Sequence, residues 1–243
     1  MTNNSDEAGF LGRPFKALRP NHETVNEIVA PPYDVITRSE AKELAAEKPF
    51  SFLRVSRAEL EMDDDLNPYD KSVYERAHEN LSKLKSSGKL LLEDKPCFYV
   101  YQIRNSIHCQ TGLALSASVR AYKQNKIRKH ELTRHAKETD RTTQIETVKA
   151  ITGPVLLAHV PNQDLDNQLK EVAASRAPDY SSSLDGWIHS IWIVSEDNLI
   201  ERIYSAINKV GTLYIADGHH RSAAAARVAD SRNSKDIQAA SDA

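Results

Sequence analysis

The sequence predicts a mixed α/β fold, of the α+β kind, built around one core. Short apolar runs of strand length are spread along the chain, and between them lie longer stretches whose apolar residues recur every three or four positions. A chain of 243 residues with 40% hydrophobic and 27% charged residues can bury one sizeable core and has the composition of a globular protein.

Five helices are predicted from apolar residues at helical spacing and from the residues at their ends. The first has Thr37 or Ser39 as its N-cap and is stopped by Pro49. The second has an apolar stripe along one face and is followed by Gly88 as a C-cap. The expected helices are Ser39–Lys48, Tyr69–Ser87, Arg134–Ile151, Asn162–Ala174 and Glu196–Val210.

Strands are predicted where apolar residues alternate or form short runs. These strands are residues 50–55, Cys97–Ile103, His108–Val119, Gly153–Val160, Ile188–Val194 and Leu213–Ala216. The second and third flank Arg104–Ile107 and are expected to pair as a hairpin. Residues 10–20 hold too many prolines for a helix and are predicted to be extended. The serine-rich residues 177–185 are predicted to be a loop.

Residues 10–229 are predicted to form a single domain between two polar ends. Residues 1–9 are expected to be disordered, and residues 230–243 are expected to form a polar tail after the last helix. No apolar stretch has the length of a signal peptide core or a membrane span, and two cysteines are too few for a disulfide framework. The sequence therefore predicts a cytoplasmic protein without membrane contact.

The sequence lacks the motifs that mark several functional classes of protein. The net charge of −2 gives no general attraction to nucleic acid, so DNA or RNA binding is not expected. The Walker A, G-x-G-x-x-G and G-x-S-x-G motifs are all absent from the sequence. These absences argue against a P-loop NTPase, a Rossmann oxidoreductase and an α/β-hydrolase.

The segment Tyr214–Ser222 is the strongest candidate for a functional site. A short apolar run breaks into Asp217–Arg221 and continues into an alanine-rich stretch, which is typical of a strand, a tight turn and a helix. A helix N-terminus offers free N–H groups to an anion, and arginine adds a fork of donors. The histidines can donate to a phosphate or move a proton, and Asp217 can hold Mg²⁺, orient a histidine, act as a base or cap the helix. A phosphate site is predicted here, with a purely structural turn as the alternative.

The segment Ala30–Ile36 contains a rigid double proline, which fixes the backbone on both sides of it. Two interpretations are open. The segment is the end of a strand followed by a turn, or it is a wall that places Tyr33 and Asp34 at a cleft.

The segment Ile127–Arg141 is rich in basic residues. If it is helical from Arg134, Lys137 and Arg141 share one face of the helix. Such a face can bind phosphate, and a solvated ladder of salt bridges is the alternative. The histidine spacing differs from H-E-x-x-H and no cysteine pair is near, so no structural metal site is expected.

Nine short segments carry a resemblance to a known family. They are Pro14–Pro20, Ala30–Val35, Asn67–Tyr69, Tyr101–Gln102, Thr111–Gly112, residues 127–131 with Thr133, Lys137–Arg141, Gly153–Pro154 and Ala216–Arg221. In this order and combination the chain resembles DUF1015, a family of uncharacterised bacterial and archaeal proteins. Members of that family continue well beyond the last segment, so the resemblance implies a truncated chain.

The run Asp217–Arg221 is also similar to the motif of ParB/sulfiredoxin-like free serine kinases, which phosphorylate L-serine with ADP or ATP. This resemblance implies a ParB/sulfiredoxin-like core, which residues 50–190 elaborate. It also implies a cradle for nucleotide phosphates, with an acid near the metal or the substrate hydroxyl. The cradle residues are Gly218, His219, His220 and Arg221, with Lys137 and Arg141 closing over the phosphates. The candidate acids are Asp217, Glu131 and Asp34.

The expected function is nucleotide binding with phosphoryl transfer to a small hydroxyl substrate, such as free serine. The expected cofactor is ATP or ADP with Mg²⁺, and Asp217 is the candidate ligand of the metal. Two alternatives are open: a ParB-like regulator that binds a nucleotide without catalysis, and a degenerate family member.

Overall fold

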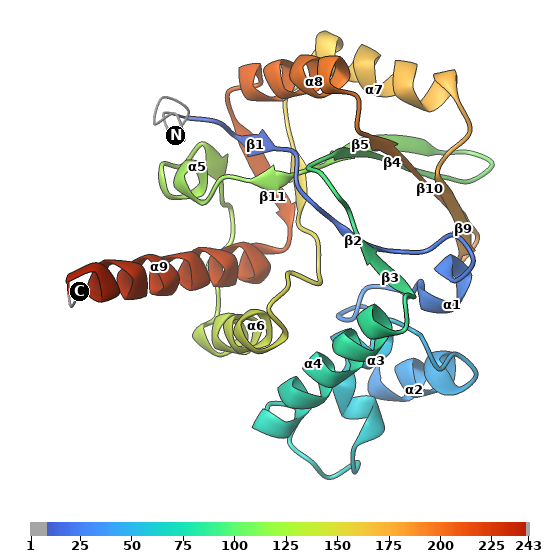
Figure 1. Cartoon of the computed structure of the whole chain (residues 1–243), viewed down its shortest axis with the longest axis vertical. Helices are drawn as coiled ribbons and strands as arrows, with labels where there is room; N and C mark the ends of the chain where they lie inside the picture. The colour runs from blue at the N-terminus through green and yellow to red at the C-terminus, as the bar shows by residue number, and fades with distance from the viewer. Residues whose placement is uncertain (1–8, 242–243) are drawn as a thin grey trace.

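The larger of two sheets at the centre of the fold is antiparallel and carries most of the main core. In this computed structural model, which describes residues 9–241 and side chains up to residue 233, the strand order is β5–β4–β10–β9. The strands are β4 (Phe98–Arg104), β5 (Cys109–Ala114), β9 (Tyr180–Leu184) and β10 (Trp187–Val194). One face presents Phe98, Trp192 and Val194 to helices α7 (Gln163–Ser175) and α8 (Asp197–Lys209), which lie side by side above the sheet (Figure 1). The predicted hairpin is confirmed by the pairing of β4 with β5.

The second central sheet has three strands in the order β7–β11–β8. Strand β11 (Leu213–Asp217) runs parallel to β7 (Ile127–Arg128) and antiparallel to β8 (Leu156–Ala158). Ile127, Leu213 and Ile215 face the same core as the larger sheet. Because β7 and β11 are parallel, their carboxyl ends meet at one edge of this sheet.

Two pairs of short strands complete the sheets of the described residues. Strand β1 (Gly12–Arg13) pairs with β6 (Ser116–Ala117), and β2 (Leu18–Pro20) pairs with β3 (Leu90–Leu92). Both β1 and β2 lie in the proline-rich segment, so the prediction of extended backbone there is confirmed. These pairings tie the N-terminal segment to the middle of the chain.

A group of helices with its own core lies below the sheets in Figure 1. It contains α1 (Val25–Ile28), α2 (Arg38–Ala46), α3 (Leu53–Ser56), the 3₁₀ helix Ala58–Glu61 and α4 (Lys71–Ser86). Helix α2 has Thr37 as its N-cap, one of the two candidates from the sequence, and Thr37 forms a capping box with Glu40. Gly88, with φ of +71°, follows α4 in the left-handed conformation expected of a C-cap.

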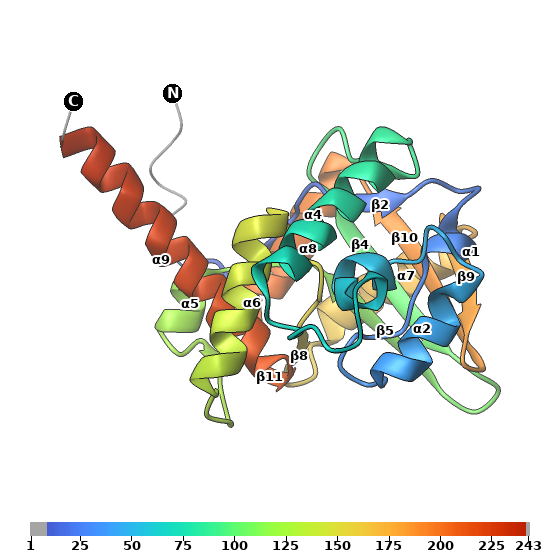
Figure 2. The same cartoon turned by 90° about the horizontal axis from the view of Figure 1, so that it is seen from below.

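Helix α6 (His135–Val148) joins this group of helices to the rest of the fold. It packs against α4 on one side and against α9 (His219–Ser241) on the other, and Figure 2 shows α6 alongside α9. Helix α5 (Val119–Lys123) lies on another side of α9. The mixed α/β class that the sequence predicts is confirmed.

Two predicted elements are wrong. Residues 50–55 were expected to form a strand, but α3 occupies Leu53–Ser56 and buries both Leu53 and Val55. Six residues, four of them apolar, are too few to separate a strand from a buried helical turn by periodicity. The serine-rich residues 177–185 were expected to form a loop, but they contain β9, because their backbone pairs with β10 along the sheet edge.

The structure describes helix α9 near the C-terminus, but it leaves out most of the N-terminal residues for which disorder is predicted. Helix α9 continues to Ser241, past the position where the polar tail was expected to begin. The disorder predicted for residues 1–9 falls on residues outside the described part, apart from Gly9. Within residues 9–241, no helix is both long and apolar enough to cross a bilayer.

Candidate functional site

Three chain segments meet at the edge of the smaller central sheet where β7 and β11 end. Residues 129–134 follow β7, Gly218 and α9 follow β11, and Gly153 lies just before β8, which runs the opposite way. Ligands of α/β proteins commonly bind outside the carboxyl ends of parallel strands. The predicted strand, turn and helix at Tyr214–Ser222 are all present in the structure.

Gly218 makes the turn between β11 and α9. Its φ of +97° lies in a region that side chains with a Cβ rarely adopt. A Cβ added there would lie 2.9 Å from Nε of Arg221 and 3.1 Å from a methyl group of Val155. Glycine therefore serves both the backbone conformation and the close approach of the arginine side chain.

The first turn of α9 presents backbone N–H groups at this edge. The Ser222 N–H donates to the carbonyl of Gly218 at 2.9 Å, which closes the first turn of the helix. The N–H groups of His219, His220 and Arg221 lie before that bond, and Gly218 has no side chain that could cap them. This arrangement, with the positive end of the helix dipole, is suited to an anion.

The guanidinium group of Arg221 lies between two carboxylates. Nη2 donates to Oδ2 of Asp217, and Nη1 is 3.5 Å from Oδ2 of Asp34. The side chain is only 12% exposed, and within the described residues its buried Nε has no hydrogen-bond partner. A buried donor without a partner is unfavourable, so a ligand or water that accepts from Nε would stabilise the site.

The two histidines hold the segment after β7 rather than pointing freely to solvent. The Nε2 atom of His219 is 3.5 Å from the backbone N–H of His130, and its Nδ1 is 3.5 Å from Oε2 of Glu131. The Nε2 atom of His220 accepts from the N–H of Arg134 at 3.1 Å. A ring nitrogen that accepts an N–H is unprotonated, so the contact of His219 with the N–H of His130 requires a neutral His219 ring.

Protonation of His219 is expected to destabilise the fold. Burial lowers the pKa of this ring from its ordinary value of 6.5, and the neighbouring His130 lowers it further. The neutral His219 ring makes its full contribution to the free energy of unfolding above about pH 6.5. This contribution is lost as the pH falls below that value, because the unfolded chain then binds a proton more readily than the folded chain does. Denaturant unfolding between pH 5 and 8 should therefore show stability rising with pH. The rise should be smaller in His219→Gln, and an equal rise in that variant would contradict the assignment.

Arg141 lies next to Tyr33 and is held by a buried network. Its guanidinium carbon lies 4.6 Å from the centre of the Tyr33 ring. Nη2 and Nε are 2.7 and 2.8 Å from Oδ2 of Asp140, and the hydroxyl of Tyr74 donates to Oδ1 of Asp140 at 2.7 Å. Burial and the bond to Asp140 raise the pKa of Tyr74 strongly, which keeps the phenol protonated as the donor. Tyr74 on α4 thus holds Asp140 in place, and Asp140 fixes the guanidinium group of Arg141.

Removal of Asp140 is expected to be costly. Asp140 and Arg141 are 14% and 16% exposed, so Asp140→Ala would leave a largely buried guanidinium without its anion. The expected loss is roughly 3 kcal/mol of unfolding free energy, against about 1 kcal/mol for Tyr74→Phe. Denaturant unfolding followed by circular dichroism measures both. The exposed pair Lys71–Glu75 on the same helix as Tyr74 is the control. A loss in Asp140→Ala no larger than that in Glu75→Ala would contradict this account.

The loop at Pro31–Asp34 brings Tyr33 and Asp34 to Arg141 and Arg221, while the cleft of the second interpretation stays a prediction. Arg57 donates from Nη1 to the carbonyls of Tyr33 and Ile36, each at 2.8 Å. The loop thereby holds Tyr33 against Arg141 and Asp34 near Arg221. The chain before the prolines ends in helix α1 and not in a strand, so that part of the first interpretation is wrong.

Two further residues belong to the description of the site. Lys137 is exposed on α6, and its role in closing over a phosphate stays a prediction. Gly153 lies in the centre of the site, because a Cβ on it would be 3.1 Å from Cδ of Arg221 and 3.8 Å from the Tyr33 ring. The Gly153–Pro154 pair, which interrupts an apolar run, is the signal in the sequence that marks this position.

Two carboxylates of the site, Asp34 and Asp217, are of the residue type that coordinates Mg²⁺. Asp217 and Asp34 both lie against Arg221 at the start of α9. Mg²⁺ usually takes one or two protein carboxylates and completes its shell with phosphate oxygens and water. Within the described part of the chain, no three or more His, Cys, Asp or Glu side chains gather as a preformed metal site.

Comparison with known proteins identifies the family of this chain but gives no activity for that family. A family model described as a protein of unknown function, DUF1015, matches residues 13–243, which is essentially the whole chain. No curated protein and no solved structure matches the chain. The ParB/sulfiredoxin-like core is a prediction that these comparisons leave open. The match over nearly the full length shows that the chain belongs to the DUF1015 family.

Proposed function

We propose that the junction of β11 and α9 binds the phosphate groups of ATP or ADP and transfers one phosphoryl group to a small hydroxyl substrate, such as free serine. The observation that carries this proposal is the convergence of unsatisfied donors at one point. The buried Nε of Arg221 and the N–H groups of the first turn of α9 lie at the same sheet edge. Phosphate oxygens are the acceptors best suited to such donors.

The surroundings of the junction support a ligand with several charges. Arg141 lies over the ring of Tyr33, and a Cβ at Gly153 would lie within 4 Å of both that ring and the Arg221 side chain, so both arginines come from the surroundings of Tyr33. Phosphoryl transfer depends mainly on positioning and on charge stabilisation, and both groups can supply these. The Gly153 and Gly218 backbones leave room for the Arg221 side chain that holds the phosphate.

The transfer itself requires an acceptor for one proton. The hydroxyl oxygen of the substrate attacks the terminal phosphorus, the bond from that phosphorus to the bridging oxygen breaks, and the shortened nucleotide leaves. The hydroxyl proton passes to a carboxylate. The three candidates are Asp34 and Asp217, which contact Arg221, and Glu131, which contacts His219. Mg²⁺, when bound, offsets the negative charge of the phosphates.

The test combines a binding assay and a turnover assay. Thermal unfolding with ATP, ADP and other nucleotides in the presence of Mg²⁺ should show a rise in Tm, because a ligand of the native state stabilises it. Incubation with L-serine should then yield phosphoserine, detected by mass spectrometry. A rise in Tm without transfer to any hydroxyl substrate would reject the kinase and leave nucleotide binding. No response to any nucleotide would reject the proposal as a whole.

A further inference from the structure

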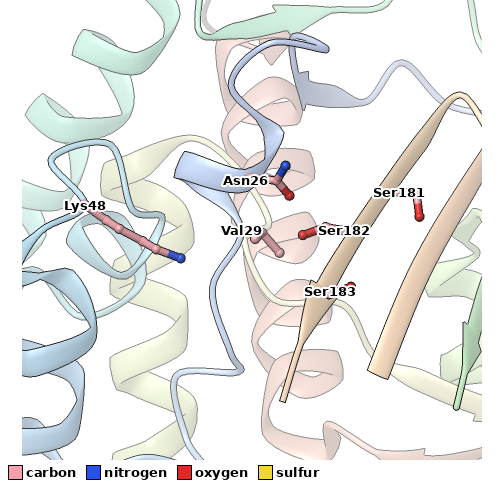
Figure 3. Close-up of a pocket in the computed structure, with 6 residues that line it drawn as sticks. All are labelled: Asn26, Val29, Lys48, Ser181, Ser182 and Ser183. Carbon is pink, nitrogen blue, oxygen red and sulfur yellow. The ribbon is translucent and has the colours of Figure 1, made fainter. Parts of the chain in front are cut away.

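A polar cavity is lined by residues from α1 and β9 and from the segment after α2, and it shares no residue with the junction of β11 and α9. It has a volume of about 390 Å³, within the range of small-molecule sites. Its lining is Asn26, Val29, Lys48, Ser181, Ser182 and Ser183. Figure 3 shows Lys48 on one side of α1 and the serines of β9 on the other. The lining thus combines an ammonium group, an amide and hydroxyl groups.

Ser182 provides the main evidence for a ligand. The residue is only 8% exposed, and within the described residues its Oγ has no hydrogen-bond partner. Its hydroxyl points from β9 toward α1 and the cavity (Figure 3). A buried hydroxyl normally has a partner, and leaving one without is unfavourable. The cavity is where that partner can bind.

The neighbouring polar groups of the sheet are already engaged with one another. His189 lies opposite Ser182 on β10, and its Nδ1 is 2.5 Å from the hydroxyl of Tyr101. The hydroxyls of Ser181 and Ser190 are 3.5 Å apart. In Figure 3 the Ser181 hydroxyl is directed away from α1, as the alternation of side chains along a strand requires. Ser182 therefore stands apart from this network and faces the cavity.

The charge of the lining selects the kind of ligand. Lys48 is the charged residue of the lining, and no carboxylate lines the cavity. An ammonium group and a hydroxyl both donate to oxygen, and an anionic oxygen makes the stronger hydrogen bond. We propose that this cavity binds a small molecule through a carboxylate or phosphate group, with Lys48 supplying the charge and Ser182 a buried donor.

The experiment is an NMR titration of the ¹⁵N-labelled protein with acetate and, separately, with inorganic phosphate. Saturable shifts of the Asn26, Ser182 and Ser183 amides are expected with at least one of the two ions, and the responding ion tells carboxylate from phosphate. Shifts of His219–Arg221 report on the nucleotide site instead. The two proposals can therefore fail independently. Shifts confined to His219–Arg221, or no saturation with either ion, would overturn the cavity proposal.

Variants show whether the binding uses the groups named. Ser182→Ala and Lys48→Gln should each weaken the affinity by about five-fold or more, as expected for the loss of one charge-assisted hydrogen bond. Ser190→Ala is the matched control, because Ser190 is a buried serine of the neighbouring strand β10 that does not line the cavity, and this variant should leave the affinity unchanged. A native-like spectrum shows that each variant is folded. Equal affinities in wild type, Ser182→Ala and Lys48→Gln would overturn the proposal.

Discussion

Replacing Arg221 with glutamine is expected to weaken nucleotide binding about 10- to 100-fold, the cost of losing charged donors to phosphate. The side chain is largely buried between Asp34 and Asp217, and its Nε has no partner within the described residues. Glutamine keeps a polar group but removes the charge and the forked geometry. Arg221→Lys should also bind poorly, because one ammonium cannot reproduce the directed donors of a guanidinium. Calorimetric titration with ATP and Mg²⁺ measures both variants.

The control for Arg221 is an arginine outside the site. Arg202 on α8 forms a surface ion pair with Glu171 at 3.1 Å, and surface pairs contribute little to stability. Arg202→Gln should therefore bind the nucleotide as the wild type does. If Arg221→Gln retained wild-type affinity, the phosphate would have to bind elsewhere, and the assignment of the junction would be wrong.

The centre of the candidate site was accessible from sequence because its geometry is local. A short strand, one glycine and the start of a helix lie within nine consecutive residues, so their order dictates where Gly218 and Arg221 lie relative to the helix N-terminus. The N-cap of α2, for which Thr37 was one of two candidates, is local in the same sense. Features of this kind depend on neighbours in the chain and need no knowledge of the tertiary fold.

The surroundings of the site were not accessible in this way, because they depend on long-range contacts. Asp34 reaches Arg221 across 187 residues, and Tyr74 reaches Asp140 across 66. The histidines looked like free proton donors in the sequence, but their nitrogens are close to backbone N–H groups of the segment after β7. Only the parallel pairing of β7 with β11 brings that segment to α9.

The errors in the fold have the same origin. The apolar residues of positions 50–55 alternate as they would in a strand, but no strand of the described residues pairs with them. Leu53 and Val55 lie instead in the short helix α3, which buries their side chains. Residues 180–184 lack the apolar alternation of a typical strand, yet five of their positions pair with β10. In both places, contacts with segments that are distant in the sequence determine the backbone conformation, and the local pattern of apolar residues does not.

Gly218→Ala is expected to damage both stability and binding. A Cβ at φ of +97° is strained, and it would lie 2.9 Å from Nε of Arg221, which must then move. The strain should cost about 1–2 kcal/mol of unfolding free energy. The displacement of Arg221 should also weaken nucleotide affinity, about as strongly as the loss of its charge, at least ten-fold. Denaturant unfolding and calorimetric titration measure the two effects separately.

Gly211→Ala is the control for Gly218→Ala, because it introduces backbone strain without displacing Arg221. Gly211 has a φ of +82°, but a Cβ added there would have no heavy atom within 4 Å. Gly218→Ala should therefore lose at least as much stability as Gly211→Ala, and only Gly218→Ala should lose nucleotide affinity. If the two variants bound the nucleotide equally well, Arg221 would not need its present position. The close approach at Gly218 would then serve the fold alone, and the phosphate would not depend on this turn.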